Sequence, residues 1–93
     1  MPNTPNLPVP AGATADDWSD FTDIDGDHAR ALVWSRHDTD KIGVAVDGWQ
    51  TADGQVIRAV SLYDADKELT AADARKLAAA LLNAADELDR LDG

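Results

Sequence analysis

The sequence contains no cysteine and few basic residues. The missing thiols exclude disulfides, thiolate zinc sites and cysteine nucleophiles. Eight lysines and arginines stand against eighteen acidic residues, which gives a net charge of -10. Nucleic acid and membranes are not expected as partners, because binding to phosphate groups requires clustered Lys and Arg. The chain also lacks an apolar run near the ~18 residues of a membrane span, and it lacks a signal-peptide pattern, so we expect a cytoplasmic protein.

Residues suited to catalysis are equally sparse. The two histidines, His28 and His37, lie ~30 Å apart if both belong to one strand, so they cannot share a metal or a catalytic centre. His37 can pair locally with Asp38 and Asp40, but that pair would lie in an exposed turn. No serine is accompanied by a nucleophile motif, and the six glycines are scattered singly, without a phosphate-binding loop. We therefore expect no enzyme, no cofactor and no dedicated metal site.

The clearest positive signal is one long amphipathic helix from Leu69 to Leu91. Thr70 is a good N-cap, Asp73 stands in a capping-box relation to it, and Leu69 can contact Ala74. Apolar residues then recur at spacings of three and four, as one face of a helix requires. This stripe consists of Ala74, Leu77, Leu81, Ala84, Leu88 and Leu91.

Three strands are predicted before this helix, over residues 28–37, 42–49 and 56–63. Asp38 to Asp40 forms a polar turn between the first two, and Ala52-Asp53-Gly54 is a strong hairpin loop between the second and third. Together these elements predict an α+β fold. It is a three- to four-stranded antiparallel β-meander, followed by one long C-terminal helix packed on one sheet face.

A proline-rich tail precedes the predicted domain. Residues 1–15 contain all four prolines and no charged side chain. A disordered, polyproline-like tail is the expected structure, and a Pro-x-x-Pro ligand is the alternative. A single small α+β domain then spans residues 16–93.

An acidic stretch opens that domain. Residues 16–27 hold six aspartates, interrupted by Trp18 and Phe21. The run from Asp23 to His28 resembles a calcium-binding loop in composition, but it fails the EF-hand pattern at the glycine and at the final acid. A solvated acidic turn is expected, and a weak, non-specific cation site is the alternative.

The first predicted strand carries apolar side chains on both faces. Leu32 and Trp34 point to one face, and Ala31 and Val33 point to the other. A single helix covers only one face of such a sheet. The other face would then be covered by the segment around Trp18 and Phe21 or by a second copy of the chain, as a homodimer.

The helical stretch Leu69-Thr70-Ala71-Ala72-Asp73-Ala74-Arg75-Lys76-Leu77-Ala78-Ala79-Ala80-Leu81-Leu82-Asn83-Ala84-Ala85-Asp86-Glu87-Leu88-Asp89 resembles the C-terminus of small actinobacterial and mycobacteriophage proteins. Upstream, Trp49-Gln50, the loop Ala52-Asp53-Gly54 and a strand ending at Tyr63 are similar too. The resemblance covers residues 28–91. It implies a β-meander followed by a helix and an actinobacterial or phage origin, but no activity and no site residues.

These observations lead to a functional hypothesis. We expect a small non-enzymatic protein-interaction module that binds and modulates a host protein if it is encoded by a phage. An acidic nucleic-acid mimic that inhibits a DNA-binding protein is one alternative, and a weak cation- or small-ligand-binding module is another. Exposed tryptophans and clustered carboxylates are the side chains that such contacts favour. The candidate interaction residues are Trp49, Trp34, Leu32, Asp20, Asp23 and Asp27.

Overall fold

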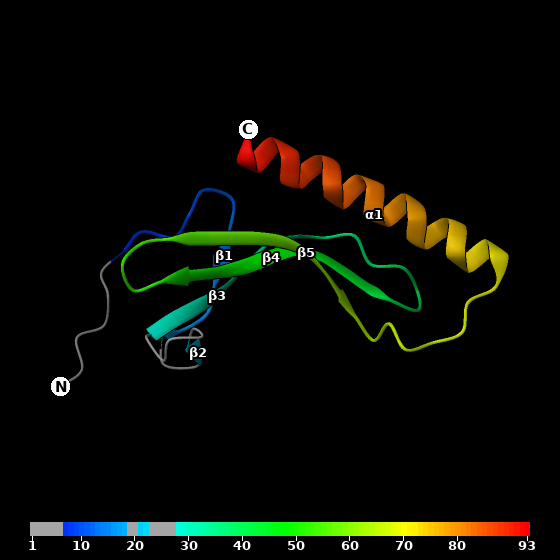
Figure 1. Cartoon of the computed structure of the whole chain (residues 1–93), viewed down its shortest axis with the longest axis horizontal. Coiled ribbons are helices and arrows are strands. Elements are labelled where there is room, and N and C mark those ends of the chain that lie inside the picture. Colours follow the sequence, from blue (N-terminus) through cyan, green and yellow to red (C-terminus); the bar gives the residue numbers. More distant parts are fainter. Residues whose placement is uncertain (1–6, 19–20, 23–27) are drawn as a thin grey trace.

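The computed structural model describes residues 7–18, 21–22 and 28–93. In chain order its elements are β1 (Thr14–Ala15), β2 (Phe21–Thr22), β3 (His28–Arg36), β4 (Gly43–Thr51), β5 (Val56–Tyr63) and α1 (Ala71–Asp92). The strands form one antiparallel sheet, and α1 crosses one of its faces (Figure 1). The predicted α+β fold, a β-meander with a C-terminal helix on one sheet face, is confirmed.

The three long strands form the predicted meander. β3 pairs with β4 and β4 pairs with β5, each pair antiparallel. In the first turn, the Thr39 N–H donates to the Ile42 carbonyl over 3.0 Å. The second turn contains Gly54, whose φ of 94° lies in the left-handed region that glycine adopts without a steric penalty. β1 and β2 are two-residue strands that both pair with the outer edge of β3, so β5 forms the opposite edge of the sheet.

Capping fixes where α1 begins, as the sequence predicts. The Thr70 hydroxyl accepts a hydrogen bond from the Asp73 N–H (3.1 Å), and the Asp73 carboxylate accepts one from the Thr70 N–H (3.2 Å). This reciprocal pair satisfies two backbone donors that have no partner within the helix. In the part of the chain that the structure describes, no helix combines the length and the apolar character needed to cross a membrane.

The main core lies between α1 and the sheet. Strand alternation places Val44 and Val46 on the α1 side, where both are fully buried, and Ile42 joins them from the preceding turn. Five of the six residues of the predicted stripe pack on this cluster from α1. Ala74 is exposed, and Ala80 takes part in its place. The residues contributed by α1 are Leu77, Ala80, Leu81, Ala84, Leu88 and Leu91.

A β-bulge in β3 changes which side chains face α1. Val33 pairs with Asp47 and Ser35 pairs with Val46, so Trp34 is an extra residue between two successive pairs. The extra residue shifts the alternation by one position. Ser35 therefore lies on the same face as Val46, the α1 side, although simple alternation from Val33 would place it on the other face.

The N-terminal segment, residues 7–18, covers the rest of the face on which α1 packs. Arg30 is buried there and donates to the Gln50 side-chain oxygen (2.9 and 2.7 Å) and to the Leu7 carbonyl (3.0 Å). The Trp18 ring lies 4.5 Å from the guanidinium carbon. Residues 7–15, which the sequence assigns to a tail, thus contact the sheet. The carbonyls of Leu7 and Ala11 accept the hydrogen bonds that attach this segment to side chains of the sheet.

Candidate functional site

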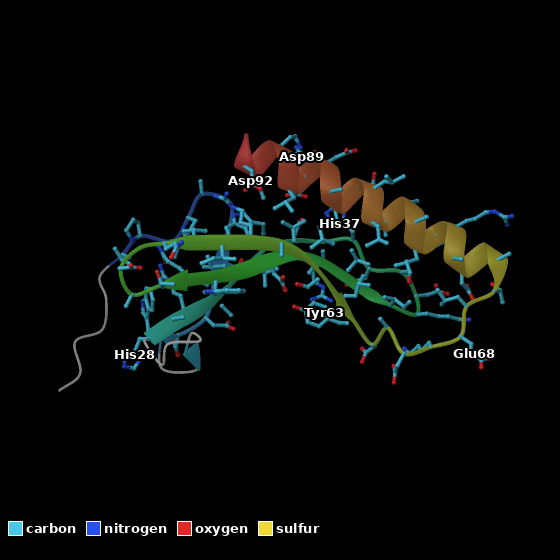
Figure 2. The ribbon with its side chains drawn as sticks, viewed as in Figure 1. His28, His37, Tyr63, Glu68, Asp89 and Asp92 are labelled. Carbon is cyan, nitrogen blue, oxygen red and sulfur yellow. The ribbon has the colours of Figure 1, made fainter. Side chains whose placement is uncertain are left out.

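The face of the sheet opposite α1 is the candidate site, and we call it the open face. The register places every second residue of β4 and β5 on it, together with two small apolar residues of β3. Figure 2 shows Tyr63 on this side, whereas His37 lies between the sheet and α1. Among the described residues, α1 and the N-terminal segment both pack on the other face. The central part of the open face comprises Ala31, Val33, Asp47, Trp49, Ala59, Ser61 and Tyr63, whereas Ala29 and Ala45, which the register places on the same face, are fully buried.

A hollow of about 420 Å³ lies on the open face. The small side chains of Ala31 and Ala59 leave this space, and the much larger Trp49 and Tyr63 also line it. Asp16, just after β1, contributes a carboxylate from the edge of the sheet. A concave surface that combines aromatic rings with a few polar groups has the composition of a protein-binding patch.

Asp47 organises the polar part of the hollow. Its carboxylate accepts hydrogen bonds from the Ser61 hydroxyl (2.5 Å) and from the Tyr63 hydroxyl. The bond to this carboxylate raises the pKa of Tyr63 above its ordinary value, because an ionised phenol has no proton to donate to Asp47. The Arg36 guanidinium lies 5.4 Å from the Tyr63 ring and bonds Asp38. The Tyr63 ring is therefore held in position by Asp47 at its hydroxyl and by Arg36 at its ring.

The predicted interaction residues separate into three groups. Trp49 lies on the open face and lines the hollow. Leu32 is only 1% exposed, and its side chain belongs to the opposite face, where it is part of the protein's own core. Trp34 is half-buried on that face, where its indole N–H donates to the Ala11 carbonyl (3.2 Å). Asp20, Asp23 and Asp27 lie outside the described residues.

The sequence left open what would cover the second face. Trp18 itself does not cover it, because the Trp18 ring packs over Arg30 on the same face as α1. The side chain of Phe21 is outside the described part of the structure. The sequence alone gives no sign of this outcome, since an aromatic residue in a loop can fold toward either face.

A second cluster, which we call the clamp, joins β3 to α1. The Ser35 hydroxyl donates to the Glu87 carboxylate (2.7 Å) and lies 3.0 Å from His37 Nε2. The same Nε2 lies 3.2 Å from Glu87 Oε2. The hydrogen bond from Ser35 is the largest cause that lowers the pKa of Glu87, and the contact with His37 adds to it, because both stabilise the charged carboxylate. His37 thus pairs with the carboxylate of Glu87 instead of the predicted neighbours Asp38 and Asp40.

The geometry of the clamp differs from that of a hydrolytic triad. In such a triad the acid holds Nδ1 of the histidine, which frees Nε2 to accept the serine proton. In the clamp, Glu87 and Ser35 both contact Nε2, and the serine proton is directed to Glu87. Sequence reasoning missed this cluster. The signal for it was the two-residue spacing of Ser35 and His37, which places them on one face of a strand.

A groove of about 640 Å³ adjoins the clamp, between the turn after β3 and the middle of α1. Its lining includes His37, Asp38, Asp40, Lys76 and Asn83. Within residues 7–18, 21–22 and 28–93, no three His, Asp or Glu side chains are grouped so that they could hold a metal ion. The groove has opposite charges side by side, whereas the hollow on the open face carries aromatic rings.

Comparisons of this chain with protein-family models, with curated proteins and with solved structures find no match.

Proposed function

We propose that this chain is a small, non-enzymatic protein-interaction module that works in the cytoplasm and binds a partner protein through the hollow of the open face. The observation that carries this proposal is the position of Trp49 and Tyr63 beside the space left by Ala31 and Ala59. Tryptophan and tyrosine are enriched among the residues that dominate binding energy at protein interfaces. A host protein is the partner we propose if the chain is encoded by a phage, as its resemblance to phage proteins suggests.

The charge of the hollow indicates the chemistry of the partner. Among the described residues that line it, Asp16 and Asp47 are charged and none is a lysine or an arginine, although the Arg36 guanidinium lies 5.4 Å from the Tyr63 ring. The whole chain carries a net charge of -10, which favours approach by a basic surface. A partner that inserts an apolar or cationic side chain between Trp49 and Tyr63 matches both properties, because aromatic ring faces attract cations.

Affinity capture with three versions of the full chain tests the proposal. The wild type, Trp49→Ala and Ala59→Arg serve as bait for an actinobacterial lysate, and bound proteins are identified by mass spectrometry. Trp49→Ala removes one aromatic wall, and Ala59→Arg fills the hollow. Val9→Arg is the matched control, because Val9 is 45% exposed in the N-terminal segment, on the other side of the sheet.

We expect one protein to be retained by the wild type and by Val9→Arg and to be lost with both hollow variants. For that protein, Trp49→Ala should weaken binding by about thirtyfold, or ~2 kcal/mol. Circular dichroism must show the same fold for all four chains. The proposal is wrong if every captured protein binds the hollow variants as well as it binds the wild type.

A further inference from the structure

Residues 7–11 lie on the α1 side of the sheet with the spacing of a polyproline helix. Proline fixes its own φ at about −65° and holds the preceding residue in the extended region. Prolines at positions 8 and 10 thus define the backbone from Leu7 to Pro10. Leu7 and Pro10 are half-buried, whereas the two residues between them are exposed. A polyproline helix has three residues per turn, which places residues i and i+3 on one side, so the burial follows the period of that helix.

Three side chains of the sheet donate hydrogen bonds to backbone carbonyls of this segment. Arg30 Nη2 donates to the Leu7 carbonyl (3.0 Å), and Gln50 Nε2 donates to the carbonyl of the next residue (3.5 Å). At the other end, the indole N–H of Trp34 donates to the Ala11 carbonyl (3.2 Å). We call Arg30, Trp34 and Gln50 the docking surface. Surfaces that carry aromatic rings bind proline-rich segments because such segments are already extended before they bind.

The sheet holds two of these donors in position. Arg30 and Gln50 are opposite each other in the register of β3 and β4, and Arg30 donates twice to the Gln50 side-chain oxygen (2.9 and 2.7 Å). The Trp18 ring lies 4.5 Å from the guanidinium carbon. Arg30 is only 8% exposed and Gln50 only 4%. Donors that are already ordered lose less entropy when a ligand binds, which favours the docking of an extended chain.

The hydrogen bonds to the segment contact its backbone and not its side chains. An extended segment of another protein therefore offers carbonyls of the same kind at the same spacing. Proline suits the half-buried position 10, because it brings no N–H group that would need an acceptor there. Residues 7–11 carry no charged side chain, so the segment that replaces them needs none.

The attachment of the segment to the rest of the fold is small. A turn at Gly12, whose φ is 80°, leads from the segment into β1, which pairs with β3 over two residues. Pro8 and Val9 are exposed. Regions with few buried apolar contacts open at a low cost in free energy while the remaining fold stays intact. The segment can therefore leave the docking surface without unfolding the sheet.

We propose that the docking surface binds a proline-rich, extended segment of a partner protein, and that residues 7–11 occupy it in the free chain. The partner's segment displaces them and accepts the hydrogen bonds of Arg30, Trp34 and Gln50. The chain's own segment is an intramolecular competitor that lowers the apparent affinity of the site. A second copy is a poorer occupant, because it must compete with a segment tethered beside the surface. The docking surface and the hollow lie on different faces, so this proposal does not rest on the proposed function.

Fluorescence anisotropy with the full chain tests the proposal. The probe is a fluorescein-labelled peptide with the sequence of residues 5–13. Pro8→Gly in the chain frees the tethered segment, because glycine lacks the fixed φ, and the peptide should bind this variant at least about fivefold more tightly than the wild type. The same substitution in the peptide should weaken its binding by a similar factor. Ala59→Arg is the matched control on the open face and should leave the affinity for the peptide unchanged.

Hydrogen exchange locates the bound peptide without any substitution in the chain. Amides in residues 9–13 of the wild type should exchange faster when the peptide is added, and amides of α1 should not change. Binding that leaves residues 9–13 protected overturns the proposal, because the peptide then lies elsewhere. Equal affinity for the wild type and Pro8→Gly, or no binding to either, also overturns it. So does a dimer of twice 9.9 kDa that the peptide dissociates, because a second copy is then the occupant.

Discussion

Lys41 Nζ donates to Asp73 Oδ2 over 2.6 Å and so ties the turn between β3 and β4 to the first turn of α1. Asp73 also accepts the hydrogen bond from the Thr70 N–H that completes the capping box. The Lys41 bond, followed by the Thr70 bonds, lowers the pKa of Asp73 from 3.8 to about 2. One carboxylate therefore begins the helix and attaches it to the sheet.

The lowered pKa of Asp73 makes part of the stability depend on pH. A carboxyl with a lower pKa in the folded state stabilises the fold while it is ionised. This contribution is complete above the ordinary pKa of 3.8 and is lost as the pH falls through about 2. We expect Asp73→Asn to destabilise the protein at pH 6 and to differ less from the wild type at pH 2. Urea unfolding at several pH values measures this. Asp66→Asn is the control for net charge, and an equal loss in both variants would contradict the role of Asp73.

The clamp predicts a second acid-sensitive contact. Glu87→Gln weakens the charge-assisted bond from the Ser35 hydroxyl, at a cost on the order of 1 kcal/mol near neutral pH. Because the folded pKa of Glu87 is lowered, the difference between variant and wild type should shrink as the pH falls below the ordinary value of 4.5. Chemical unfolding at pH 7 and at low pH measures it. Asp86→Asn, at an exposed neighbouring position, is the control for net charge.

Arg30 holds the N-terminal segment on the sheet. Arg30→Met leaves the side-chain oxygen of Gln50 and the carbonyl of Leu7 without their donor, and we expect a loss of about 1–3 kcal/mol. Amides in residues 9–13 should exchange faster with solvent, and proteases should cut this segment sooner. Arg36→Met is the control, because Arg36 is exposed on the other side of the sheet and its ion pair with Asp38 contributes little. Unchanged protection in Arg30→Met would show that the segment is held by other contacts.

Gly48 of β4 leaves no room for a side chain beside β5. A Cβ atom at this position would lie 1.8 Å from the Ile57 carbonyl oxygen, which is backbone and cannot move aside alone. We expect Gly48→Ala to cost roughly 3 kcal/mol or more and to lower the melting temperature by about 10 °C or more. Differential scanning calorimetry measures it, and a melting temperature equal to that of the wild type would rule out this close approach.

Local sequence patterns were enough to predict the three long strands and the helix, although not the short strand β1, which lies within the predicted tail. Thr70 and Asp73 form the capping box that marks the helix start, and the third strand was predicted with the bounds it has, Val56–Tyr63. The hairpin loop at Gly54 was predicted because a positive φ favours glycine. Each of these features depends on residues close together in the chain, which is why a single sequence reveals them.

The candidate site depends on contacts that local patterns do not encode. Ser35 meets Glu87 across 52 residues, and the bulge at Trp34 is what turns Ser35 toward α1. The N-terminal segment contacts the sheet through backbone carbonyls of Leu7 and Ala11. Every residue has such a carbonyl, so no side-chain pattern in the sequence predicts this contact. Strand alternation predicted that Leu32 and Val33 lie on opposite faces of the sheet. The sequence alone did not show which of these two faces the helix covers.

Calorimetry with the captured partner tests the central claim, that the hollow of the open face is the binding surface. The partner is titrated into the wild type, Ala59→Arg and Leu82→Glu. We expect Ala59→Arg to weaken binding by at least about tenfold, because an arginine fills the hollow, and Leu82→Glu, at an exposed position of α1, to leave the affinity unchanged. If Leu82→Glu weakens binding and Ala59→Arg does not, the partner binds at α1, and the open face is not the functional site.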